Sequence, residues 1–176
     1  LERDHGWGGL LIEPNKFRFG ECLVNRNSET NFIKRCALVS FDHKEPTVCG
    51  NFEEINLGES LVSQITTPLD YYDEHQLLAT NEKRKHKNNV MVPARTLQSL
   101  IDECDVKKID FLSLDVEGYE VEAMNGLDFT KNAPSFIRVE TSTFQYRKDQ
   151  MTSYMASKGY DFLGMPNEND CFYGKK

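Results

Sequence analysis

The sequence has no excess of basic residues: 21 lysines and arginines stand against 28 aspartates and glutamates, with a net charge of −7 and a pI near 5.2. A protein that binds nucleic acid needs a positive surface to meet the phosphates, so this balance argues against nucleic acid as the main partner. The chain also lacks an uninterrupted apolar run of the length that a membrane span requires, and no signal peptide opens it. We therefore expect no membrane span within these residues.

The cysteines do not form a recognisable framework. The chain has five of them, an odd number, and none forms a CxxC pair, which argues against both a zinc cluster and a disulfide scaffold. We expect reduced thiols that pack as small apolar side chains. The default compartment is then the cytoplasm, and a secretory-pathway form anchored by a preceding membrane span is the alternative.

A chain of 176 residues is long enough for one domain with a buried core. Apolar strands alternate with amphipathic helices, which predicts an α/β fold with a mostly parallel sheet and a C-terminal antiparallel hairpin. Residues 69–89 have little periodicity and carry a basic cluster, which predicts a flexible insertion: a solvated loop or a flap over a ligand. Strands are predicted at 9–13, 32–39, 47–52, 90–92, 109–114, 136–140, 160–163 and 171–173, and helices at 16–25, 96–104, 119–125 and 144–158.

Three apolar strands end in a carboxylate, at Glu13, Asp115 and Glu140. In an open parallel sheet, ligands bind beyond the carboxyl ends of the strands, so acids at these ends favour a binding site. An acid after a strand can also simply cap the next helix. Asp115 and Glu117 flank one residue, so in an extended segment both would point the same way. Such a pair can hold a metal, orient a substrate hydroxyl or share a proton.

Four segments carry a resemblance to a known family. They are GWGGLLIEPN (6–15), VPARTLQSLID (92–102), IDFLSLDVEGYEVEAMNGL (109–127) and FIRVET (136–141), and residues 35–40 are similar to a further strand. In this order they resemble the FkbM-type family of S-adenosylmethionine-dependent methyltransferases. The LIEP and D-x-E-G-x-E blocks are the specific parts of the match.

The resemblance implies a Rossmann-like class I methyltransferase sheet that serves O-methylation of a hydroxyl on a sugar or other small molecule. By position, Glu13 would bind the ribose of S-adenosylmethionine. Cys36 and Ala37 would also be cofactor-binding residues and would lie beside its adenine. Asp115 would lie near the methionine moiety and the transferred methyl group. Glu117 and Glu140 would line the acceptor pocket, and these three acids are the catalytic candidates. A divalent metal is compatible with them but is not implied.

Such a methyltransferase normally opens with a strand and a glycine-bearing loop that wraps the cofactor. The glycines at 6–9 precede a strand, whereas a phosphate or cofactor cradle follows one, so they are not a substitute. We therefore expect an N-terminally truncated domain whose sheet lacks its first, central strand. The alternatives are that the sheet rearranges or that another chain fills the gap.

Two other functions fit parts of the pattern. A methyltransferase-like domain without chemistry could serve as a binding or trafficking module. A dinucleotide-dependent oxidoreductase would also place an acid on a ribose, but the chain offers no recognisable tyrosine–lysine proton relay. The acceptor, the oligomeric state and metal dependence are left open by the sequence.

Overall fold

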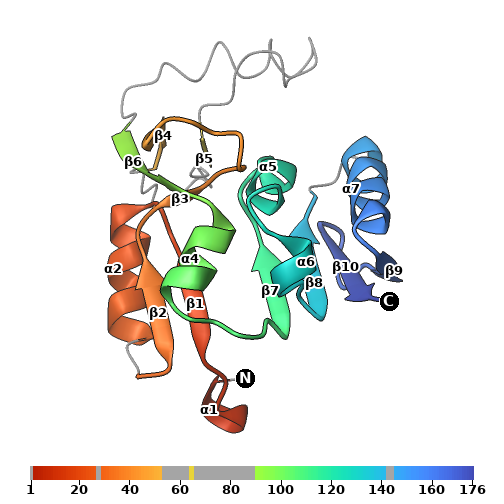
Figure 1. Cartoon of the computed structure of the whole chain (residues 1–176), viewed down its shortest axis with the longest axis horizontal. Helices are drawn as coiled ribbons and strands as arrows, with labels where there is room; N and C mark the ends of the chain where they lie inside the picture. Colours follow the sequence, from red (N-terminus) through yellow and green to blue (C-terminus); the bar gives the residue numbers. More distant parts are fainter. Residues whose placement is uncertain (1, 27–28, 53–63, 66–89, 142–144) are drawn as a thin grey trace. The chain divides into compact units, whose positions relative to one another are not determined.

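The computed structural model describes residues 2–26, 29–52, 64–65, 90–141 and 145–176 (Figure 1). The chain forms two compact units, one made of Leu1–Ala37 and Glu45–Ala94 and the other of Leu38–Lys44 and Arg95–Lys176. The flexible insertion predicted at residues 69–89 lies outside the described residues.

The first unit contains a parallel strand pair joined by a helix. Strand β1 (Gly9–Ile12) leads into α2 (Lys16–Asn25) and returns as β2 (Asn31–Lys34), which pairs with β1 in parallel register. The predicted strand 32–39 is two strands, because β3 (Ala37–Leu38) belongs to a different sheet, of order β3-β6-β4-β5. The remaining elements are α1 (Glu2–His5), β4 (Thr47–Asn51), β5 (Gln64–Ile65) and β6 (Val90–Arg95), with β5 and β6 antiparallel to β4.

Helix α2 begins where the sequence predicts. Asn15 is its N-cap, and its side-chain oxygen accepts the backbone N–H groups of Phe17 and Arg18 at 2.8 and 3.1 Å. The periodicity of residues 16–25 predicts Phe17, Leu23 and Val24 on the buried side of the helix, but they are 49%, 45% and 81% exposed, so this prediction is wrong. The apolar stripe exists, but α2 contributes no buried side chain in the described structure.

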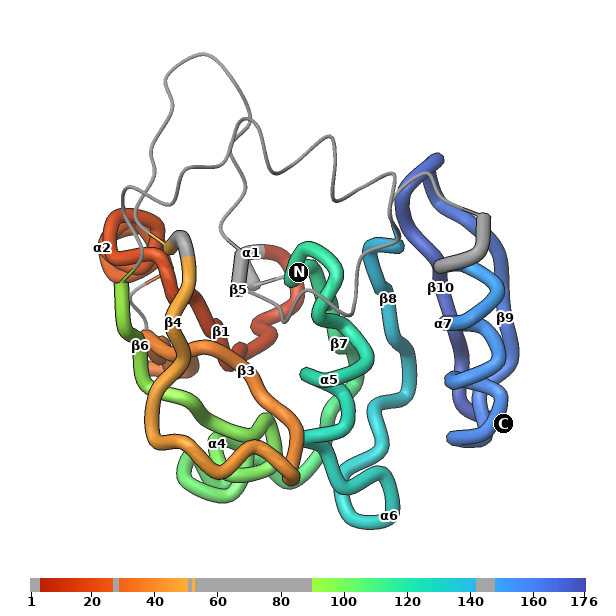
Figure 2. The backbone as a smooth tube through the Cα atoms, turned by 90° about the horizontal axis from the view of Figure 1, so that it is seen from above, coloured from red at the N-terminus to blue at the C-terminus, as the bar shows by residue number. Residues whose placement is uncertain are grey.

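The second unit is built on a four-stranded sheet of order β7-β8-β10-β9 (Figure 2). Strands β7 (Phe111–Leu114) and β8 (Phe136–Glu140) are parallel, whereas β10 (Asp170–Lys175) is antiparallel to both β8 and β9 (Tyr160–Gly164). The predicted C-terminal antiparallel hairpin is therefore confirmed. The expectation of a mostly parallel sheet is not met, because the described sheets are mixed: β10 pairs antiparallel with β8 and β9, and β4 pairs antiparallel with β5 and β6. Among the described strands, β1 and β7 each have a strand partner on one side only.

Buried side chains from the sheet and α7 (Gln145–Ser157) form the core of this unit. Ile137 and Val139 of β8 and Met155 of α7 are fully buried. Tyr160 is 2% exposed, and its hydroxyl donates to the carbonyl oxygen of Pro134 at 2.5 Å, so its polar atom is satisfied inside the core. Figure 2 shows α7 running alongside β9 and β10.

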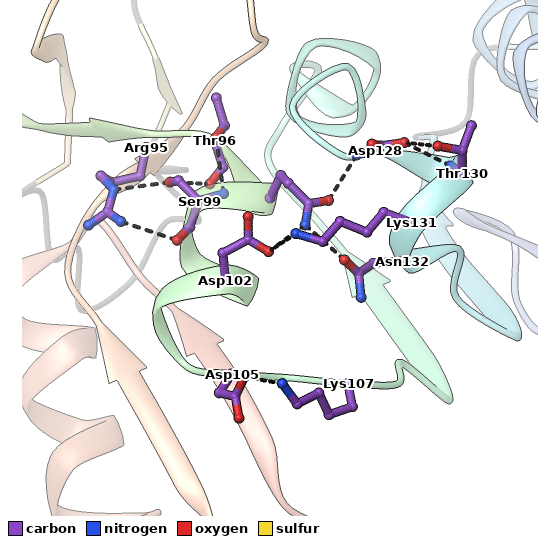
Figure 3. A network of polar contacts seen from close by, with 11 residues as sticks. Arg95, Thr96, Ser99, Asp102, Asp105, Lys107, Asp128, Thr130, Lys131 and Asn132 are labelled. Carbon is purple, nitrogen blue, oxygen red and sulfur yellow. Dashed lines mark hydrogen bonds and ion pairs between the residues drawn. The ribbon is translucent and has the colours of Figure 1, made fainter.

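Polar contacts tie two helices of the second unit together, and Figure 3 shows one of them, the ion pair of Asp102 with Lys131. Gln98 of α4 (Leu97–Glu103) donates to Asn132 of α6 (Phe129–Asn132) at 2.8 Å and accepts the N–H of Asp128 at 3.1 Å. Asp102 of α4 also pairs with Lys131 of α6 at 2.6 Å. The Lys131 contact, followed by a hydrogen bond from Gln98, holds the pKa of Asp102 below its ordinary value.

Two glycines that follow helices behave differently. Gly159 has a φ of +85° after α7, which suits the left-handed residue that ends a helix. The position of Gly126, two residues after α5 (Glu120–Met124), also predicts a left-handed residue, but Gly126 is not among the residues with positive φ. It is needed for space instead, because a Cβ there would lie 2.2 Å from the carbonyl oxygen of Val39.

Candidate functional site

Three carboxylates meet at the carboxyl ends of β7 and β8. Asp115 follows β7 directly, and Glu140 is the last residue of β8. The parallel register pairs Leu114 with Val139, so the next residue on each strand is an acid and the two acids are neighbours. One oxygen of each of Asp115, Glu117 and Glu140 lies within 4.8 Å of the others. We call these three side chains the acid cluster.

Glu117 reaches the acid cluster through a turn. An extended segment would have pointed Asp115 and Glu117 the same way by alternation. Instead, Glu117 has a φ of +58° and Gly118 a φ of +100°, so the backbone turns sharply in the left-handed region. Glycine takes this region freely, whereas a glutamate there is uncommon and marks a constrained turn.

A fourth acid, Glu120, supports this turn and was missed among the predicted site residues. It is 7% exposed, and one of its oxygens accepts the N–H groups of Val116 at 3.3 Å and of Gly118 at 2.9 Å. The available signal was its place as the last acid of the D-x-E-G-x-E block, in the first turn of α5. An acid there also benefits from the positive end of the helix dipole.

The acid cluster holds a carboxyl group that titrates near neutrality. Burial, a hydrogen bond with Asp115 and the negative charges of Asp115, Glu117 and Glu120 together raise the pKa of Glu140 to about 7. Two carboxylates this close repel each other unless a positive charge lies between them. A shared proton supplies that charge, and a hard divalent cation such as Mg²⁺ would also suit these oxygen donors.

Asp170 lies opposite Glu140 on β10 and is only 3% exposed. Its carboxylate is paired with Arg138 and also accepts the side-chain amide of Asn167. A buried charge needs such partners to offset its loss of hydration. The carboxylate of Asp170 therefore has its polar partners in β8 and in the turn before β10, and β10 lies on the side of β8 away from β7.

The other predicted cofactor residues belong to the first unit. Glu13 follows β1, its N–H continues the strand pairing with the carbonyl of Lys34 at 3.0 Å, and its side chain accepts the N–H of Asn15 at 2.8 Å. Glu13 thus helps to start α2, as the capping interpretation expects, and a carboxylate has further acceptor sites for a ligand. Cys36 and Ala37 are 2% and 3% exposed, so an adenine beside them would displace protein atoms that cover them.

No helix in the described part of the chain has the length and apolarity of a bilayer-crossing segment.

Comparison with known proteins identifies the family. No curated protein and no solved structure shows significant similarity to the chain. Residues 1–162 match the model of the methyltransferase FkbM domain, in agreement with the motifs at the ends of β1, β7 and β8. Since this match spans most of the 176 residues, the chain belongs to the FkbM methyltransferase domain family.

Proposed function

We propose that the protein transfers a methyl group from S-adenosylmethionine to a hydroxyl oxygen of a sugar or other small molecule. The observation that supports this most is the acid cluster at the carboxyl ends of two parallel strands, in a chain of a methyltransferase family. This is the edge at which open α/β sheets bind ligands. We also propose that the sheet is Rossmann-like.

The proposed chemistry divides the work among the acids. When bound, S-adenosylmethionine would supply an electrophilic methyl group for the acceptor oxygen, with its sulfur as the leaving group. The acceptor hydroxyl loses its proton, and the pair formed by Asp115 and Glu140 can take it because the pKa of Glu140 lies near neutrality. Glu117 would accept a hydrogen bond from a second hydroxyl and fix the acceptor in line.

Glu13 is proposed to bind the ribose of the cofactor through its diol. Glu13→Ala should weaken binding of S-adenosylhomocysteine about tenfold or more, because it removes charge-assisted hydrogen bonds. Isothermal titration calorimetry measures this affinity. Glu21→Ala is the matched control, since Glu21 is an exposed acid of α2 paired with Arg18. Equal affinities in wild type and Glu13→Ala would remove Glu13 from the cofactor site.

The raised pKa of Glu140 makes stability depend on pH. Between its usual value of 4.5 and about 7, the folded protein keeps a proton that the unfolded chain has released. The associated stability is therefore fully present below pH 4.5 and is lost as the pH rises through about 7. Glutamine at position 140 carries no charge at any pH. After allowance for solvent screening, the free energy of unfolding of Glu140→Gln should be about 1 kcal/mol higher than that of wild type at pH 8. At pH 4.5 the two proteins should have similar free energies of unfolding.

Urea denaturation at the two pH values, with EDTA present to exclude metal ions, tests this prediction. Glu168→Gln is the control, because Glu168 is an exposed acid in the turn between β9 and β10. A Glu140→Gln effect of equal size at both pH values would contradict the assigned pKa.

A further inference from the structure

The turn that carries Glu117 depends on a side chain outside the acid cluster. Glu120 is nearly buried, and a single oxygen of its carboxylate accepts two N–H groups, those of Val116 and Gly118. These two residues flank Glu117. The carboxylate therefore holds the backbone on both sides of the residue whose side chain joins Asp115 and Glu140.

The same turn is one that the backbone does not adopt readily. Glu117 lies in the left-handed region at φ +58° and is followed by Gly118 at φ +100°. A non-glycine residue stays in that region only when its surroundings hold it there. Tyr119, the N-cap of α5, makes no side-chain capping hydrogen bond, so the usual device that joins a turn to a helix is missing at this position. Glu120, in the first turn of the helix, provides side-chain hydrogen bonds to the turn instead.

We propose that Glu120 is a positioning residue, whose carboxylate holds the Asp115–Gly118 turn and thereby keeps the Glu117 carboxylate beside Asp115 and Glu140. The role of this turn in catalysis rests on the methyl-transfer function proposed above. The arrangement of the turn and the carboxylates can be tested without cofactor or acceptor. Without Glu120, the backbone at Glu117 would relax toward the right-handed or extended region and carry its side chain away.

Two substitutions separate geometry from charge. Glu120→Gln and Glu120→Ala both remove the negative charge, but only glutamine keeps an oxygen that can accept the two N–H groups. Hydrogen exchange measured by NMR should show the Val116 and Gly118 amides exchanging much faster in Glu120→Ala than in Glu120→Gln. Asp128→Ala is the control, because Asp128 caps α6 through the N–H of Thr130 and so loses a comparable contact at another helix.

The second readout reports whether the three carboxylates still converge. Terbium(III), titrated alone and followed by luminescence, serves as the probe, since a trivalent cation binds convergent oxygen donors far better than scattered ones. Glu120→Ala should bind terbium about tenfold more weakly than Glu120→Gln, the loss typical when a residue that orients a ligand is removed. Glu117→Gln should also weaken binding, whereas Asp128→Ala should not.

Each outcome decides the proposal. Equal terbium affinity in Glu120→Ala and Glu120→Gln, no saturable terbium site in wild type, or unchanged amide exchange in Glu120→Ala would overturn it. Loss of terbium affinity in Asp128→Ala to the same extent would also overturn it, because the effect would then be general destabilisation. A failure to bind S-adenosylhomocysteine would count against the proposed function and leave these results unaffected.

Discussion

Asp115→Asn is expected to lower the turnover number for methyl transfer about 100-fold or more, the range typical of losing a group that takes a proton in the transition state. Asparagine has nearly the same shape and can still hydrogen-bond to Glu140, so the strand ends should keep their arrangement. It cannot accept a proton at neutral pH, and it removes one of the charges that raise the pKa of Glu140. The affinity for S-adenosylhomocysteine should change much less than turnover.

Transfer of a labelled methyl group to a panel of sugars and small hydroxyl compounds measures this effect. Asp110→Asn is the matched control, because Asp110 precedes the other end of β7 and pairs on the surface with Lys108. A parallel assay with EDTA separates the two ways of neutralising the acid cluster, since a cation would be removed and a proton would not. Turnover near the wild-type value in Asp115→Asn would show that proton removal does not require Asp115, contrary to the proposed role of the Asp115–Glu140 pair. Cofactor binding without transfer to any acceptor would favour the binding-module alternative.

Gly126→Ala is expected to lower the free energy of unfolding by about 3 kcal/mol, at the upper end of what overpacking usually costs. The added Cβ would lie 2.2 Å from the carbonyl oxygen of Val39 and within 3.3 Å of two further backbone atoms, of Ala123 and Leu97. All three neighbours are backbone atoms, so no flexible side chain can yield. The shift would also strain the hydrogen bond from the N–H of Gln98 to the Gly126 carbonyl, at 2.8 Å.

Urea denaturation followed by circular dichroism measures this loss. Gly20→Ala is the matched control, because Gly20 lies inside α2 and a Cβ there meets nothing within 4 Å. Alanine is the better helix former by up to about 1 kcal/mol, so this variant should be unchanged or more stable. A Gly126→Ala protein as stable as wild type would show that Val39 and the turn after α5 can separate without cost.

Some elements could be predicted because their causes are local. Asn15 starts α2 through its own side chain, and Gly159 ends α7 because glycine takes a left-handed φ without strain. The segments that became β1, β7 and β8 are short and mostly apolar, which is typical of strands. The hairpin of β9 and β10 followed from two apolar runs around turn residues. In each case a few neighbouring residues carry the information.

Other features depended on contacts between distant residues. The segment 32–39 reads as one strand, but its two halves pair in different sheets. Gly126 appeared to be a helix stop, and only the approach of Val39 shows that its missing side chain is what matters. Glu120 looked like one more acid in a charged block, and its role appears only when its hydrogen bonds to Val116 and Gly118 are seen.

By itself, the sequence determined the family, the alternation of strands and helices, and the presence of an acid at the ends of β1, β7 and β8, since these follow from residue order and short-range pattern. Only the tertiary structure decided that Asp115, Glu117 and Glu140 converge and that Glu140 titrates near neutrality. Convergence requires the register between β7 and β8 and a left-handed turn at Glu117, and a shifted pKa requires burial and charges brought from several segments. Both are properties of distances in space, which residue order does not specify.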